Sequence, residues 1–101
     1  MYLPPHFEEQ NEKEIINLIE QFPLATLVCY SDGEFVVNHI PLLRDCDGVY
    51  IGHIAKANPL STLFPNGTNA IAIFNGEDSY ISPNWYPTKV QDHRQVPTWN
   101  Y

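Results

Sequence analysis

Positive charge is scarce in this sequence. Only five residues are Lys or Arg, against twelve Asp or Glu, and the formal net charge is −7 at pH 7. Proteins that bind nucleic acid neutralise phosphates with clustered Lys and Arg, and anionic membrane surfaces attract the same side chains. The composition therefore argues against a surface that binds nucleic acid or an anionic membrane. We expect no direct DNA contact by this segment and no membrane association.

Long apolar runs and cysteine pairs are also missing. No apolar run approaches the roughly 20 residues of a membrane-spanning helix, and the start at Met1–Pro5 does not have the pattern of a signal peptide. Cys29 and Cys46 have no metal-ligand spacing and are too few for a disulfide framework. These absences predict a cytoplasmic location and two free thiols, with Cys29 in the core because it lies within an apolar run.

Clustered catalytic groups are absent too. The four histidines are scattered, so the sequence predicts no catalytic triad and no metal site. It also has no glycine-rich phosphate loop and no dinucleotide fingerprint. Any redox chemistry would therefore have to come from a bound cofactor.

What the sequence does contain is enough apolar material for one domain over residues 1–101, since 44% of its residues are hydrophobic. The spacing of Ile15, Ile19 and Phe22 predicts a helix over residues 8–22, ended by Pro23. Strands are predicted at 24–30, 34–43, 49–55 and 69–75. Asp-Gly turns separate the first three, which predicts an antiparallel meander, and a short helix is expected at 58–64.

The stretch Gly52–Pro59 is the first candidate site, because a strand end meets a helix start there. Asn58 is a good N-cap, Pro59 a good first helical residue, and Lys56 adds a cation. Such a joint can hold an anion against the amides of the helix start. The alternative is a solvated lysine beside an ordinary cap.

Two further segments are candidates. Asn38 and His39 interrupt an apolar strand, and one of them must face away from the core because neighbouring strand residues point to opposite faces. The segment 79–89 is expected to be a loop whose Trp85 covers a flat aromatic ligand or packs onto the protein itself. Lys89 is either a second phosphate-binding cation or plain surface.

The ending at Trp99 and Tyr101 has the character of a strand that needs a core. We expect that this strand either pairs with another subunit or continues into further sequence, and we favour the second.

Five motifs resemble, in order, the PaiB-like FMN-binding proteins, known as negative transcriptional regulators: 1–7 (MYLPPHF), 39–42 (HIPL), 52–59 (GHIAKANP), 80–86 (YISPNWY) and 96–101 (VPTWNY). The resemblance implies a mostly β fold with α-helices. This fold is an antiparallel split β-barrel of the pyridoxamine-phosphate-oxidase-like class, a homodimer with FMN near the subunit interface. Family members are about twice as long, so the chain resembles their N-terminal part, with an incomplete barrel.

The resemblance also suggests which residues bind the flavin. In the wider split-barrel group, a cation just before an Asn-Pro helix start holds the flavin phosphate, and Lys56 matches that position. The full set that we predict to bind FMN is Lys56, Ala57, Asn58, His39, His53, Asn84, Trp85, Lys89 and Trp99.

The oxidase reaction is not implied, because the segment around His39 replaces the arginine that such oxidases carry on the second strand. The alternatives to a flavin-binding regulator are a flavin-dependent oxidoreductase for an unknown small molecule and a dimerisation module without ligand.

Overall fold

The computed structural model describes residues 3–64, 67–87 and 96–100, so Lys89 and Tyr101 lie outside the described residues. Its elements are η1 (Pro5–Phe7), α1 (Glu12–Gln21), β1 (Leu24–Ser31), β2 (Glu34–Pro41), β3 (Leu43–Arg44), β4 (Tyr50–Ile51), α2 (Leu60–Leu63), β5 (Ala70–Ile73), β6 (Ser79–Ile81), η3 (Pro83–Trp85) and β7 (Thr98–Asn100). The fold is mostly β, with antiparallel pairing throughout the described sheets.

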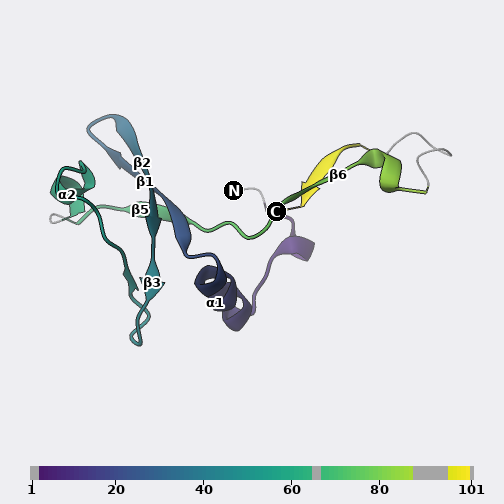
Figure 1. Ribbon diagram of the computed structural model, residues 1–101, viewed down its shortest axis with the longest axis horizontal. Helices are drawn as coiled ribbons and strands as arrows, with labels where there is room; N and C mark the ends of the chain where they lie inside the picture. The colour runs from purple at the N-terminus through teal and green to yellow at the C-terminus, as the bar shows by residue number, and fades with distance from the viewer. Residues whose placement is uncertain (1–2, 65–66, 88–95, 101) are drawn as a thin grey trace.

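The main sheet has the order β2-β1-β5, with β1 in the centre (Figure 1). β1 and β2 form the predicted hairpin, in full register from Leu24 opposite Pro41 to Ser31 opposite Glu34. Asp32 and Gly33 make its turn with φ values of 52° and 87°. Positive φ at both central positions is what a two-residue hairpin turn requires, and Asp-Gly supplies it at low cost.

The predicted three-stranded meander is wrong in its third strand. β2 ends at Pro41, which has no N–H for a ladder, and the Leu42 N–H donates instead to the Pro23 carbonyl at 2.9 Å. The chain then forms a separate two-stranded ribbon, in which Leu43 and Arg44 of β3 pair with Ile51 and Tyr50 of β4. The other neighbour of β1 is β5, which arrives from much later in the chain.

Both helices are shorter than predicted. α1 begins at Glu12 because the Asn11 side chain caps it, accepting from the Lys13 N–H at 3.1 Å, and residues 8–11 are not helical. It ends at Gln21, just before Phe22 and Pro23, and none of its residues is buried. α2 is a single turn of four residues.

The core lies between one face of the main sheet and α2. Its buried hydrophobic residues are Ala25, Leu27, Cys29, Ile40 and Leu60. The odd-numbered residues of β1 point to this face, which confirms that Cys29 is a core residue. The opposite face of the sheet is apolar but open: Phe35 is 72% exposed, Ile71 65% and Tyr30 59%.

The pair β6–β7 forms a third unit, which we call the aromatic hairpin (residues 79–87 and 96–100). The sequence predicted a loop at 79–89, but Ser79–Ile81 pairs with Thr98–Asn100, and η3 follows β6. Figure 1 shows this hairpin extending away from the main sheet, at the far end from α2.

The arrangement of these units is open. The radius of gyration is 18.5 Å, whereas a compact domain of this length has about 13 Å. The described sheets do not close into a barrel; they are the open strands of an incomplete split barrel.

Candidate functional site

The segment from Ala55 to Ser61, which we call the Lys56 turn, is tied together by short-range hydrogen bonds. The Asn58 N–H donates to the Ala55 carbonyl at 2.9 Å, and the Ser61 hydroxyl donates to the Lys56 carbonyl at 3.0 Å. The first bond closes a tight turn, and the second holds the start of α2 against that turn. The two bonds restrain the backbone on either side of Lys56.

Asn58 connects this turn to the main sheet. Its Oδ1 accepts from the Leu60 N–H at 3.0 Å, which is the capping role that the sequence predicts. Its Nδ2 donates to Oδ1 of Asn38 on β2 at 2.7 Å, in a partly buried position. Both ends of the Asn58 carboxamide are thus engaged within the protein.

The amides of α2 are not directed at a ligand. The Leu60 N–H donates to Asn58 Oδ1. The Ser61 N–H donates to the Asn58 carbonyl, and the Thr62 N–H donates to the Pro59 carbonyl. A single turn also carries little of the dipole of a longer helix. The sequence-based interpretation included phosphate binding by the amides at the start of this helix. The amides of Leu60, Ser61 and Thr62 are not free to do so, because each is bonded within the protein.

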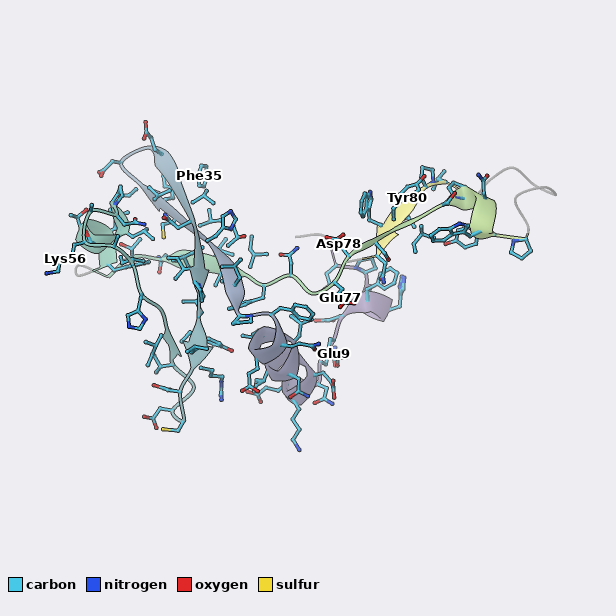
Figure 2. The ribbon with its side chains drawn as sticks, viewed as in Figure 1. Glu9, Phe35, Lys56, Glu77, Asp78 and Tyr80 are labelled. Carbon is cyan, nitrogen blue, oxygen red and sulfur yellow. The ribbon has the colours of Figure 1, made fainter. Side chains whose placement is uncertain are left out.

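Lys56 itself is available. Its side chain is exposed and points away from the sheet at one end of the molecule (Figure 2). Within residues 3–64, 67–87 and 96–100, no ion pair occupies its ammonium group. Ala57, the next residue, is exposed as well. The turn thus offers one unneutralised cation on a fixed backbone, which suits a phosphate monoester.

The two polar residues of β2 point to opposite faces of the sheet. Asn38 shares the core face with Ile40, whereas His39 lies on the open face, where its Nδ1 is 3.1 Å from Oγ1 of Thr26. The structure therefore brings Asn38 to the Lys56 turn, whereas His39, which we predicted to bind FMN, lies on the opposite face of the sheet. Alternation along the strand puts Asn38 and Ile40 on one face and His39 on the other, but it does not say which face is turned inward.

The remaining predicted ligands are scattered. His53 is exposed and follows β4. Trp85 and Trp99 lie on the aromatic hairpin, 67% and 59% exposed, and Asn84 stands beside Trp85, with its N–H donating to Ser82 Oγ at 3.3 Å. The Trp99 ring meets Tyr80 edge-on, with centroids 5.8 Å apart. Figure 2 shows Tyr80 and Lys56 far apart along the long axis of the molecule, so one chain does not bring Lys56 and the aromatic hairpin together.

An apolar groove of about 430 Å³ lies on the core face of the main sheet, lined by Leu27, Ile40, Leu42, Tyr50, Gly52, Ile54, Phe64 and Ala72. Among the described residues, none of the predicted flavin ligands lines this groove, and its lining holds no cation for a phosphate.

Comparison with known proteins identifies the kind of domain. A family described as "Putative FMN-binding domain" matches residues 1–101, the whole chain. The chain belongs to this FMN-binding family. Membership gives FMN as the cofactor, and the exposed Lys56 and the exposed indoles are groups that fit a phosphate and a flat aromatic ring.

Two curated proteins resemble this FMN-binding chain. It is 35% identical over 104 residues to "Protease synthase and sporulation protein PAI 2" of Bacillus subtilis, a PaiB-like protein, covering all of this chain and 48% of that one. It is 29% identical over 123 residues to "Uncharacterized protein YKL070W" of Saccharomyces cerevisiae, covering 72% of that protein. The chain thus spans about half the length of the Bacillus relative.

The described residues lack two further features. No group of three or more His, Cys, Asp or Glu side chains there could hold a metal ion. None of the helices in the described part of the chain has the length and hydrophobicity needed to cross a bilayer.

Proposed function

We propose that this FMN-binding protein holds the flavin phosphate with the Lys56 ammonium and acts in a homodimer as a negative regulator of gene expression. The observation that carries the phosphate assignment is the exposed Lys56 on a hydrogen-bonded turn. Only five Lys or Arg residues occur in the chain, so a cation at this family motif that has no ion pair among the described residues is a specific feature.

The phosphate contacts are assigned first. The Lys56 ammonium supplies charge-assisted hydrogen bonds to phosphate oxygens, and the backbone of Ala57 lies beside it. Asn58 contributes by shaping the turn, since both ends of its side chain are already bonded. Lys89 is proposed as a second cation for the same phosphate.

The flavin ring is assigned to Trp85 and Trp99, which offer large exposed aromatic surface, with Asn84 as a polar neighbour. His39 and His53 complete the proposed set. FMN bound to the protein supplies redox-active isoalloxazine chemistry; the chain itself binds and orients it.

The proposed homodimer is supported by where these residues lie. Lys56 and the aromatic hairpin stand at opposite ends of the molecule, and His39 faces away from α2. A flavin that uses both groups therefore takes its phosphate contact from one copy and its ring contacts from the partner. The open shape supports the same arrangement, because a two-stranded hairpin without packing is only marginally stable.

The regulatory role is supported by the likeness to the PaiB-like regulators and by the name of the Bacillus relative, a sporulation protein. The net charge of −7 favours an indirect route to gene expression over phosphate contacts with DNA. A cytoplasmic location, with Cys29 and Cys46 as free thiols, is part of the same proposal.

Flavin titration tests the phosphate assignment. FMN and riboflavin, which lacks the phosphate, are each titrated into the full-length protein while flavin fluorescence is followed. We expect Lys56→Ala to weaken FMN binding about 10- to 100-fold, as for the loss of a hydrogen bond to a charged group, and to leave riboflavin binding unchanged. Lys13→Ala, at an exposed position of α1, is the matched control. Equal FMN affinity in the wild type and Lys56→Ala proteins would overturn the assignment.

Mixing two defective variants tests the shared site. Lys56→Ala and Trp85→Ala subunits each carry one defect, and a mixed dimer of the two contains one intact composite site. We expect the mixture to recover tight FMN binding at about a quarter of the sites, because half the dimers are mixed and each has one intact site of two. No recovery in dimers shown to be mixed would contradict a site built from two copies.

A further inference from the structure

Asn38 is absent from the residues that the sequence assigns to the flavin, yet its side chain reaches the Lys56 turn. Within residues 3–64, 67–87 and 96–100, two side chains outside this turn hydrogen-bond to it. Thr62, the next residue along the chain, donates its hydroxyl to the Pro59 carbonyl at 2.8 Å, and Asn38 is the one that comes from the main sheet. The bond from Asn58 Nδ2 to Asn38 Oδ1 is 2.7 Å long and joins residues 20 positions apart. It is also partly buried, so water competes for it less than at the surface.

The direction of this bond follows from the capping bond. A carboxamide has one acceptor oxygen and one donor nitrogen, and Asn58 uses its oxygen for the Leu60 N–H. Its nitrogen therefore faces β2, and Asn38 must present its own oxygen. Each amide is oriented by the other, and the pair is matched only when Asn38 offers an acceptor.

The Lys56 turn has two anchors on the main sheet. Leu60 is fully buried against Leu27, Cys29 and Ile40, which holds the end of the turn by packing. The Asn38–Asn58 bond holds its middle, two residues from Lys56. Packing alone leaves a turn free to pivot about the buried side chain, and the second anchor removes that freedom.

We propose that Asn38 is a positioning residue that presets the Lys56 turn for the phosphate monoester of FMN. The proposal rests on the phosphate role of Lys56. Without the bond, the turn samples more conformations and must be ordered when the phosphate binds, which lowers affinity. Asn38 acts through Asn58 and Lys56, so it affects the phosphate and has no effect on the flavin ring.

The test compares FMN with riboflavin in the full-length protein. Asn38→Leu keeps the approximate size of the side chain and removes the acceptor. We expect about 3- to 10-fold weaker FMN binding, as for the loss of one hydrogen bond, and unchanged riboflavin binding. Asn38→Ser, whose hydroxyl is too short to reach Asn58, should behave in the same way and guards against poor folding of the leucine variant. Asn17→Leu, at an exposed site on α1, is the matched control.

A second readout separates positioning from general stability. Hydrogen exchange should be faster at the Asn58 and Leu60 amides of the Asn38 variants, while the amides of the central strand β1 keep their protection. On a Lys56→Ala background, Asn38→Leu should weaken FMN binding no further, since the two act on one contact.

The outcomes are distinct. If the wild type prefers FMN to riboflavin and the Asn38 variants keep that preference in full, the positioning role is wrong and the Lys56 assignment stands. If the variants lose affinity for FMN and riboflavin equally, Asn38 has only a structural role, which also overturns the proposal. If the wild type itself shows no preference for FMN, the phosphate role of Lys56 fails first.

Discussion

Gly52 lies so close to Leu42 that a Cβ on Gly52 would stand 2.7 Å from Leu42 Cδ2. The same atom would be 3.0 Å from Ile40 Cγ2 and 3.2 Å from the Pro41 carbonyl oxygen. The Leu42 side chain can move, but Ile40 is buried and the carbonyl belongs to the backbone. The chain leading to the Lys56 turn therefore passes β2 where only glycine fits.

Gly52→Ala should destabilise the protein by about 1–3 kcal/mol, the usual cost of overpacking. The measurement is the free energy of unfolding from urea denaturation. Gly76→Ala is the matched control, because its nearest heavy atom would be 3.7 Å away, an ordinary contact. Equal stability of the two variants would contradict the close packing at Gly52.

Gly33→Ala tests the hairpin turn through conformation alone. A Cβ at Gly33 meets nothing within 4 Å, but the residue has φ = 87°. We expect a loss of about 1–2 kcal/mol from the left-handed conformation, and a smaller loss for Gly33→Asn, because asparagine tolerates that region. If thermal unfolding shows the same loss of stability for Gly33→Ala and Gly33→Asn, the turn geometry is not as described.

Leu60→Ala should be the most damaging of the core substitutions, at about 2–5 kcal/mol. Leu60 is fully buried and joins α2 to the main sheet, so its truncation removes contacts and leaves a cavity. Leu43→Ala, at a side chain that is 67% exposed, should cost much less. Chemical denaturation of both variants checks the difference.

The exposed indoles give an optical test of the proposed flavin contact. Trp85 and Trp99 are the two tryptophans, and both side chains are exposed. Iodide should quench their fluorescence efficiently in the free protein and less after FMN binds. Single Trp85→Phe and Trp99→Phe variants assign the change to one ring. Unchanged quenching at saturating FMN would remove both rings from the proposed site.

Local signals in the sequence were sufficient for several features. Asp-Gly placed the β1–β2 turn, and the apolar run around Cys29 placed the core strand. Asn58 was expected to cap, and its Oδ1 does accept from Leu60. These features depend on residues within a few positions of one another, which is why pattern and propensity reveal them.

Long-range relationships were out of reach of those signals. The third predicted strand was expected to pair with the second. Instead, β2 ends at Pro41, and β3 and β4 form a separate ribbon. The main sheet is completed by β5, which pairs with β1. The strand β6 was hidden in a segment that its prolines and polar residues made look like a loop. Pairing with β7, about 20 residues later, decided its structure.

The sequence by itself determined the hairpin turn, the alternation of β1, the cap at Asn58 and the place of Lys56 just ahead of a short helix, because each is set by neighbouring residues. Only the tertiary structure decided that Asn38, and not His39, reaches the Lys56 turn, and that the aromatic hairpin stands apart from it. Alternation shows that adjacent residues face opposite ways, but which way is inward depends on what packs there. For β2 that choice is made by Leu60 and Asn58, which come about 20 residues later in the chain.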